Sequence, residues 1–252
     1  MALQFSERED KEREHHNRRW AGDDPRHHLH KWYFALKPGM DEQDRLVRES
    51  GAGGAVLELG CADGLLAIEE QRLPATVGSY FGIDISDVAV EKARVRAAQH
   101  GYRNCRFAAV SAEATGLDSG SFNVVYGRGI IHHLDLDRAY AEASRLLVPG
   151  GKAIFFEPLG YNPVLNGFRK RTPEARTDDE RPLLEDDIFL ARKHFRDVRY
   201  KAFGLTSVLS VPVRKTKAGP IALGFFAGID RLLFALPPIR RQAWYALMLL
   251  TK

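Results

Sequence analysis

Short apolar runs alternate with amphipathic, helix-length segments in the middle of the chain, from about residue 54 to residue 157. The runs are rich in β-branched and aromatic residues and read AVLEL, SYFGI, NCRFAAV, FNVVYG and KAIFFE. Continuous apolar character in VLEL, FNVV and AIFF is typical of strands buried on both faces. Strands that alternate with helices predict crossover helices on both sides of a sheet. We therefore expect an α/β fold with a Rossmann-like, doubly wound, mostly parallel sheet.

The two ends of the chain follow other patterns. Residues 1–53 carry finely alternating charges and then an aromatic, histidine-rich piece, which predicts a helical N-terminal cap. Beyond residue 157, prolines and clustered charges replace the regular alternation. There we expect a helix near 184–194, a strand near 198–203 and a final strand at the sheet edge in RQAWYALMLLTK. Residues 158–252 are thus predicted to add a substrate lid and the last strands to the domain formed by residues 54–157.

The turn after the first predicted strand, in VLELGCADGLLAI, limits the ligands that this sheet edge suits. A dinucleotide fingerprint needs glycines at its first, third and sixth positions. Here those positions hold Gly60, Ala62 and Leu65, so the third glycine is missing. No lysine follows Gly64, which excludes a GxxxxGK phosphate loop.

Two acidic residues favour a nucleoside with a cationic arm. Asp84 ends the second predicted strand and can accept hydrogen bonds from both hydroxyls of a ribose. Glu58 precedes the turn, where a negative charge would repel a pyrophosphate and attract an ammonium or sulfonium. The signs of the charges favour S-adenosylmethionine over NAD.

Several ordered pieces resemble the class I S-adenosylmethionine-dependent methyltransferases, in particular the methyltransferase type 11 or UbiE-like branch. These pieces are VLELGCADG, GIDIS, AEATGLDSGSFNVV, HHL and LLVPGGKAIFFEP, and they cover roughly residues 54–157. The resemblance implies that Asp84 holds the ribose and that Ile85 packs on adenine. It also implies that the turn wraps the methionine part through Glu58, Gly60, Cys61, Ala62 and Gly64.

The sequence departs from the family at the adenine site. The family's piece reads Gly-Asp-Ala-Glu, with the Asp reaching the adenine amino group, whereas this chain has Val110, Ser111, Ala112 and Glu113. Adenine recognition is then expected to use the Ser111 hydroxyl, the Ala112 amide or Glu113.

The resemblance places Gly127 and Arg128 at the methionine end of the cofactor. Arg128 is expected to pair with the methionine carboxylate, since guanidinium and carboxylate groups form strong charge-assisted hydrogen bonds.

Candidate catalytic groups follow the fourth and fifth predicted strands. His132 or His133 could take a proton from an acceptor hydroxyl or amine. The alternative, that one of them packs and caps the helix near Asp137, stays open. Glu157 and Tyr161 lie at the same edge and could orient an acceptor, although Glu157 could equally accept hydrogen bonds from loop amides.

No metal site is expected. The histidines of the N-terminal region have no cysteine nearby, and adjacent histidines on a helix point in different directions; they are His15, His16, His27, His28 and His30. Two cysteines, Cys61 and Cys105, make no disulfide framework. The charged N-terminus lacks the apolar run of a signal peptide, so we expect a cytoplasmic protein.

The chain's basic character is local. Lys and Arg number 37 against 33 Asp and Glu, but from residue 166 onward we count 17 basic and 9 acidic residues. The small excess over the whole chain does not call for a nucleic-acid partner, and no DNA binding is expected.

The apolar run 220–229 is stopped by Asp230 and Arg231 and is too short to span a bilayer. Packing within a lid is our first interpretation of 220–241, and contact with a membrane surface is the second.

These observations predict an S-adenosylmethionine-dependent methyltransferase that acts by direct displacement and leaves S-adenosylhomocysteine. The acceptor is expected to be a small hydrophobic molecule such as a secondary metabolite, quinone or lipid, methylated on oxygen, nitrogen or carbon. A non-catalytic S-adenosylmethionine-binding partner subunit and an RNA methyltransferase remain alternatives. A nicotinamide oxidoreductase is disfavoured by the absent third glycine.

Overall fold

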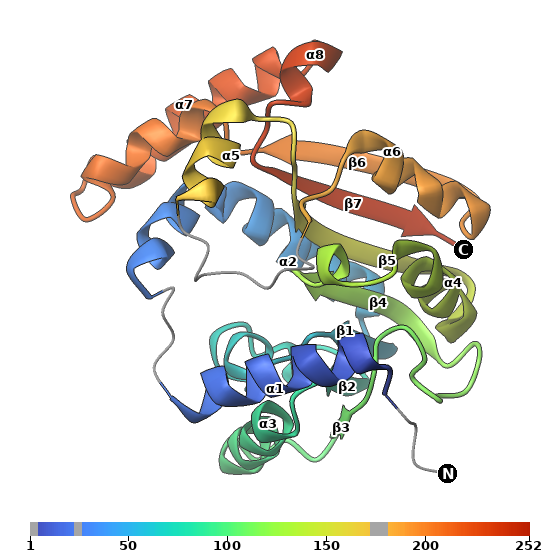
Figure 1. The fold of residues 1–252 in the computed structure, drawn as a ribbon. Coiled ribbons are helices and arrows are strands. Elements are labelled where there is room, and N and C mark those ends of the chain that lie inside the picture. The colour runs from blue at the N-terminus through green and yellow to red at the C-terminus, as the bar shows by residue number, and fades with distance from the viewer. Residues whose placement is uncertain (1–4, 23–26, 172–180) are drawn as a thin grey trace.

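A seven-stranded, mostly parallel sheet forms the centre of the computed structural model, which describes residues 5–22, 27–171 and 181–252 (Figure 1). The strand order is β3-β2-β1-β4-β5-β7-β6. The strands are β1 (Ala55–Leu59), β2 (Ser79–Asp84), β3 (Cys105–Ala109), β4 (Phe122–Arg128), β5 (Leu147–Pro158), β6 (Asp197–Phe203) and β7 (Tyr245–Thr251). Strands β1 to β5 run parallel, and β7 is antiparallel to both of its neighbours. The predicted doubly wound α/β fold is confirmed.

The last strand differs from the prediction, because β7 does not lie at the sheet edge. It pairs with β5 on one side and β6 on the other over seven residue pairs each. Four residues of its ALMLL core are buried, namely Ala246, Leu247, Met248 and Leu250, as expected for an interior strand. Strand β6 carries charged residues at alternate positions, which suits the edge that it occupies.

Helices cover both faces of the sheet. On one face lie α4 (Leu136–Leu146) and α6 (Glu185–Leu190), which continues into η6 (Ala191–Lys193). On the other face lie α2 (Lys37–Gly51), the π-helix η2 (Leu65–Glu70) and η3 (Leu73–Ala75). Helix α3 (Asp87–Gln99) packs beside β2 and β3 and begins at Ser86, whose side chain accepts a hydrogen bond from the Ala89 amide.

Residues 1–53 do not form a single cap, because α2 belongs to the layer on the sheet. Gln43 is fully buried and its side-chain amide donates to the carbonyls of Gly127 at 2.8 Å and Ile154 at 3.2 Å. Helix α1 (Glu7–Ala21) lies apart from α2, across the carboxyl ends of the first strands (Figure 1). The connecting η1 spans His27–Leu36.

The C-terminal additions form a separate layer at one end of the sheet (Figure 1). They comprise α5 (Pro163–Lys170), η7 (Thr206–Val213), α7 (Gly219–Leu233) and α8 (Pro237–Arg240). Helix α7 packs on η7, which in turn packs on η1. Among the described residues, no helix combines the length and apolar character needed to cross a bilayer.

Gly39 sets how closely α2 approaches the sheet. A Cβ atom at this position would lie 2.7 Å from the Phe156 ring and 2.8 Å from the Phe203 ring. We expect Gly39→Ala to lower the free energy of unfolding by about 1–3 kcal/mol, because a methyl group must be forced into a filled core. Denaturant unfolding measures this change.

Gly224 provides the matched control, since nothing lies within 4 Å of a Cβ atom there. Gly224→Ala should raise the free energy of unfolding by about 0.5–1 kcal/mol through helix propensity. Equal effects of the two substitutions would contradict the close approach at Gly39.

Candidate functional site

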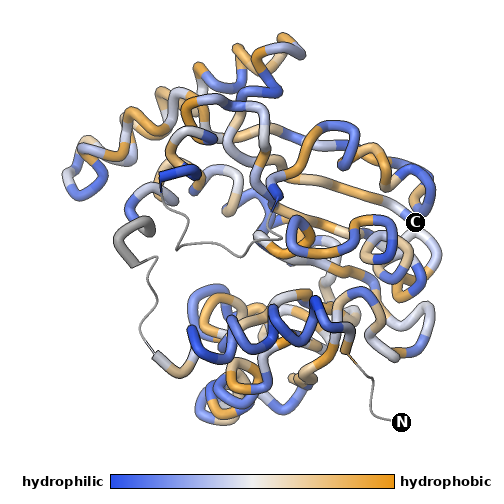
Figure 2. Tube along the Cα trace, viewed as in Figure 1, coloured by the Kyte–Doolittle hydropathy of each residue, from blue (hydrophilic) through white to orange (hydrophobic). Residues whose placement is uncertain are grey.

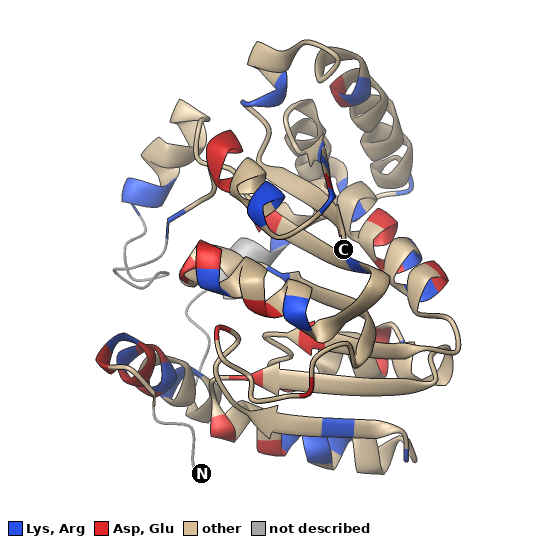
Figure 3. Ribbon diagram, turned by 90° about the vertical axis from the view of Figure 1, so that its right-hand side faces the viewer, with Lys and Arg blue, Asp and Glu red and all other residues tan. Residues whose placement is uncertain are grey.

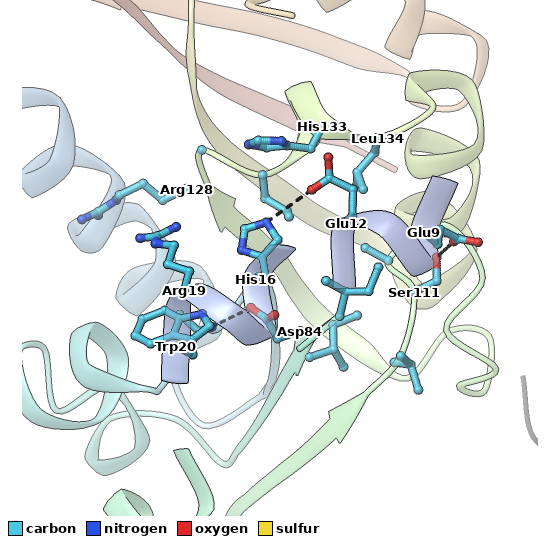
Figure 4. Close-up of a pocket in the computed structure, with 18 of the residues that line it drawn as sticks. Glu9, Glu12, His16, Arg19, Trp20, Asp84, Ser111, Arg128, His133 and Leu134 are labelled. Atoms are coloured by element: carbon cyan, nitrogen blue, oxygen red, sulfur yellow. Dashed lines mark hydrogen bonds and ion pairs between the residues drawn. The ribbon is translucent and has the colours of Figure 1, made fainter. Parts of the chain in front are cut away.

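A cavity of about 280 Å³ lies at the carboxyl ends of β1 to β4, beneath α1 (Figure 4). This is the sheet edge where ligands bind in doubly wound folds, and the volume is near the lower end of the range for ligand pockets. Predicted site residues that line it are Gly60, Ala62, Asp84, Ile85, Ser111, Ala112, Arg128 and His133. Helix α1 adds Arg8, Glu9, Glu12, His16, Arg19 and Trp20.

The turn after β1 follows a left-handed backbone path. Gly60, Ala62 and Gly64 have φ angles of 71°, 51° and 73°. Ala62 therefore adopts a conformation that favours glycine, as residues at functional sites often do. Gly60 and Ala62 line the cavity, whereas Gly64 lies beneath the turn, where a Cβ atom would be 2.6 Å from the Ile68 side chain.

Cys61 does not line the cavity as the resemblance implied. Its side chain is buried against β2, where a Cβ atom at Gly82 would lie 2.9 Å from the Cys61 sulfur. Burial raises the pKa of the Cys61 thiol well above its usual value. Cys61 thus fills space under the turn and is not an activated nucleophile.

Asp84 is fixed at the end of β2 by two backbone amides. Its Oδ2 accepts a hydrogen bond from the Ala62 amide at 2.9 Å, and its Oδ1 accepts one from the Ser86 amide at 2.9 Å. Burial raises the pKa of Asp84, and these two hydrogen bonds act in the opposite direction. The carboxylate holds the turn after β1 and the start of α3 in place while it faces the cavity.

The end of β3 meets a carboxylate from α1 (Figure 4). The Ser111 hydroxyl donates to Glu9 Oε1, and Glu9 Oε2 accepts from the Ser6 amide at 2.7 Å and the Ser6 hydroxyl at 2.6 Å. Although burial raises the pKa of Glu9, the hydrogen bonds from Ser111 and Ser6 lower it below the usual value. A buried, charged carboxylate therefore lies beside Ser111 and Ala112.

Glu113 is not available to a ligand. Its side chain is buried, pairs with Arg8 and Arg138 and accepts a hydrogen bond from the Asp135 amide at 2.9 Å. It does not line the cavity, so its position gives no support to the expected role at adenine. Its pairing with Arg8 fastens α1 to the sheet instead.

Arg128 lines the cavity but is already engaged by α2. Its Nε donates to Gln43 at 2.9 Å and its Nη2 lies 2.5 Å from the Asp44 carboxylate. Gly127 lies behind it within β4, where a Cβ atom would be 2.5 Å from Ile130. Gly127 therefore allows close packing and does not itself line the cavity.

Glu58 lies outside the cavity, contrary to the sequence-based expectation. Its side chain is buried on the α2 face of the sheet and accepts a hydrogen bond from the Tyr80 hydroxyl. Burial raises its pKa from 4.5 to about 7. A carboxyl that is partly protonated near neutral pH and buried beneath the turn does not supply the charge argument that favoured a sulfonium.

Two comparisons of sequence bear on this site. Residues 56–151 match the family model of a methyltransferase domain. Aklanonic acid methyltransferase DauC of Streptomyces sp. (strain C5) is 31% identical over 114 residues, which is 45% of this chain and 52% of that protein. A ubiquinone biosynthesis O-methyltransferase of Albidiferax ferrireducens is 33% identical over 113 residues, 44% of each chain. The chain thus spans about half the length of these curated relatives.

A solved structure extends the likeness of fold to the whole chain. Geranyl diphosphate C-methyltransferase from Streptomyces coelicolor A3(2) aligns over 98% of this chain and 97% of its own, with a TM-score of 0.63 at 13% sequence identity. Residues 56–151 thus match a methyltransferase domain, and the solved structure shares the fold around it.

The two histidines after β4 take different positions. His133 lines the cavity, whereas His132 is buried, and their ring centroids are 4.2 Å apart. His132 Nδ1 lies 2.6 Å from Glu157 Oε2, and Glu157 Oε1 accepts hydrogen bonds from the amides of Ile130 at 3.0 Å and Ile131 at 3.2 Å. Glu157 therefore satisfies loop amides and also orients His132.

Tyr161 does not line the cavity. Its hydroxyl accepts a hydrogen bond from the Glu185 amide at 3.1 Å, and its ring lies under the Arg241 guanidinium. Tyr161 thus joins α6 to the C-terminal layer. Its proposed role in orienting an acceptor has no support in this position.

Sequence reasoning missed the contribution of α1 to the site. A signal was present, because Ser6 and Glu9 have the spacing of a capping box and fix where the helix begins. From that start, Glu9, Glu12 and His16 fall at helical spacing on one face. Figure 4 shows Glu12 and His16 beside His133, with 3.4 Å between the His16 and Glu12 side chains.

Of the other histidines considered for metal binding, the side chains of 27, 28 and 30 lie outside the described part of the chain.

The raised pKa of Glu58 generates a prediction about stability. Between pH 4.5 and about 7 the folded state binds a proton at Glu58 that the unfolded chain has released, so the free energy of unfolding falls as the pH rises. This single group should remove about 3 kcal/mol across that interval. Urea unfolding of the wild type and Glu58→Gln at several pH values isolates the effect. Parallel pH profiles for the two proteins would show that Glu58 titrates normally.

Proposed function

We propose that this chain binds S-adenosylmethionine in the cavity beneath α1 and transfers its methyl group to a small hydrophobic acceptor. The carboxylate of Asp84 carries the proposal, since two backbone amides fix it at the end of β2 with its face toward the cavity. A carboxylate in this place can accept hydrogen bonds from both hydroxyls of a ribose. The methyltransferase domain match over residues 56–151 supports the same assignment.

The polar groups of the cavity fit a nucleoside better than a pyrophosphate. The Ala62 amide, which a phosphate-binding turn would direct at its ligand, donates to Asp84 instead. Carboxylates at Glu9, Glu12 and Asp84 line the cavity. The guanidinium groups of Arg8, Arg19 and Arg128 line it as well, so the cavity suits a cofactor that carries both a cationic and a carboxylate group. This argument replaces the one based on Glu58.

S-adenosylmethionine supplies a methyl group that its positive sulfur already activates for displacement. The protein's contribution is then alignment, which can account for much of a rate acceleration. The turn from Gly60 to Ala62 and the bridge at Asp84 hold the cavity floor in one conformation. Helix α1 forms one wall of the cavity.

We propose that His133 takes a proton from an acceptor hydroxyl or amine, and the position of its side chain in the cavity wall supports this role. His132 is proposed to act as a positioning residue. Its ring packs on that of His133, and Glu157 holds its Nδ1. A carboxylate paired with one nitrogen of a histidine fixes the ring orientation.

The hydrophobic acceptor is proposed from the relatives and from composition. The names of similar proteins refer to aklanonic acid, ubiquinone biosynthesis and geranyl diphosphate, and the last two names specify O-methylation and C-methylation. The proposal therefore concerns the class of the acceptor.

The function is tested by incubating the protein and S-adenosylmethionine with an extract of small molecules. We expect a mass-spectrometric search to find a compound that gains about 14 mass units, the replacement of H by CH₃ in a displacement reaction. A reaction with S-adenosylhomocysteine in place of S-adenosylmethionine, which has no methyl group to transfer, serves as the inactive control. Tight binding of S-adenosylhomocysteine without any methylated product would favour the non-catalytic binding subunit.

Asp84→Asn should weaken binding of S-adenosylhomocysteine by about tenfold or more, because hydrogen bonds to a charged group contribute about 1.5–3 kcal/mol. Titration calorimetry measures the change. Asn retains one oxygen that can accept from a backbone amide, so the fold should persist. Asp63→Asn is the matched control, since Asp63 pairs with Arg96 and does not line the cavity. Equal affinities of the two variants would refute the ribose assignment.

We also propose that Glu9 supplies the carboxylate that recognises the adenine amino group. Its Oε1 is held by Ser111 at the end of β3, next to Ile85 and Ala112 in the cavity wall. A carboxylate accepts from an amino group but repels the carbonyl oxygen of hypoxanthine. The protein should therefore prefer S-adenosylhomocysteine over its inosine analogue.

Glu9→Gln should reduce that preference by about tenfold, because one charged acceptor becomes neutral. Gln still suits the third position of the capping box, so α1 should remain formed. Calorimetric titration with both nucleosides gives the preference directly. Glu12→Gln, one turn further along the helix, should leave it unchanged. An unaltered preference in Glu9→Gln would remove Glu9 from the adenine site without affecting the assignment of Asp84.

A further inference from the structure

Helix α7 presents an apolar face to solvent along its whole length. Its outward positions recur at helical spacing and are Pro220, Ile221, Gly224, Phe225, Gly228 and Leu232. The side chains of Ile221, Phe225 and Leu232 are 75%, 65% and 76% exposed. Figure 2 shows α7 in mainly apolar colours and Figure 3 shows it almost free of charge, at the outer end of the molecule. An apolar stripe of this kind on a surface helix indicates a binding partner.

The opposite side of α7 fixes the helix to the protein. Asp230 is buried, and its two carboxylate oxygens accept hydrogen bonds from the amides of Leu205, Thr206 and Ser207. They also accept hydrogen bonds from the hydroxyls of Thr206 and Ser207. Leu223 is buried on the same side. The two charged residues that interrupt the apolar run thus lie on opposite faces of α7, because Asp230 is buried and Arg231 is exposed. The apolar stripe is therefore a fixed surface and not a disordered segment.

The charges around α7 have one sign. Residues 204–244 contain six basic residues and a single acidic one, which is the buried Asp230. Lys215 and Lys217 lie in the exposed turn before the helix, and Arg231 lies on the outward face. At the far end, Arg240 and Arg241 pair with Glu185. The apolar stripe thus has positive charge at its beginning and within it, and no exposed acid.

We propose that the outer face of α7 docks on an anionic lipid bilayer. An apolar face rimmed by Lys and Arg lies in the boundary between headgroups and acyl chains, with its cations near the phosphates. With 15 residues, α7 is about 22 Å long and lies in this plane as a surface anchor. The inference concerns a surface distant from the cavity under α1 and does not depend on the proposed function.

A second copy of the chain is the competing occupant, and the charges disfavour it. Two α7 faces brought together would place the basic turns and Arg231 of each copy in one interface without any exposed acidic partner from residues 204–244. Like charges in an interface are repulsive, whereas a surface of anionic lipids is complementary. The observations therefore favour lipid over self-association.

Flotation of the full chain with lipid vesicles tests the proposal. We expect binding to vesicles that contain phosphatidylglycerol, little binding to pure phosphatidylcholine, and release at high salt. The double variant Ile221→Ser with Phe225→Ser should bind at least about tenfold more weakly, because two large apolar side chains no longer enter the bilayer. Lys215→Glu with Lys217→Glu should reduce binding by about tenfold as well.

Val95→Ser is the matched control, because Val95 is an apolar residue 49% exposed on α3, at the opposite end of the molecule (Figure 1). It should bind vesicles as the wild type does. Circular dichroism and thermal unfolding establish that each variant is folded, and Ile221→Ala with Phe225→Ala replaces the serine pair if that pair unfolds. Equal binding by the α7 variants and the wild type would overturn the proposal. So would a wild-type dimer that dissociates in the α7 variants, with no vesicle binding by either protein.

Discussion

The bridge formed by Asp84 is the interaction on which the site depends. One carboxylate oxygen accepts from the turn after β1 and the other accepts from the residue that begins α3. Three elements that meet at the sheet edge are thereby held by a single side chain. Ala62 maintains a left-handed backbone conformation within this arrangement, so the hydrogen bond from its amide offsets part of the conformational cost. A ligand then meets a preformed floor at the ends of β1 and β2.

Helix α1 completes the cavity from a distant part of the sequence. Polar contacts join it to the loops after β2 and β3 and to the start of α3, through Arg8 with Glu113, Glu9 with Ser111 and Asn17 with Asp87 and Ser86. Polar contacts of this kind lose less on opening than an apolar interface of equal area, because water can replace them. The helix therefore combines two properties that the site needs. It contributes charged groups to the cavity wall, and it covers the cavity without burying a large apolar surface of its own.

The sequence predicted the parallel sheet, the strand positions and the cavity residues near Gly60 and Asp84, because periodicity and turn chemistry are local signals. It did not predict that Glu58 is buried, where its side chain accepts a hydrogen bond from Tyr80 of the neighbouring strand. The pairing of Glu113 with Arg8 spans 105 residues, and no spacing rule could supply it. The position of β7 between β5 and β6 likewise reflects burial on both faces, which the apolar run ALMLL indicated but its terminal place in the chain obscured.

The central claim is that the cavity under α1 is a nucleoside site organised by Asp84. A crystal structure of the chain with S-adenosylhomocysteine tests it most directly. The account predicts both ribose hydroxyls within hydrogen-bonding distance of the Asp84 carboxylate, and the adenine amino group beside Glu9 and Ser111. A ribose bound away from Asp84, or a nucleoside outside the cavity, would contradict it.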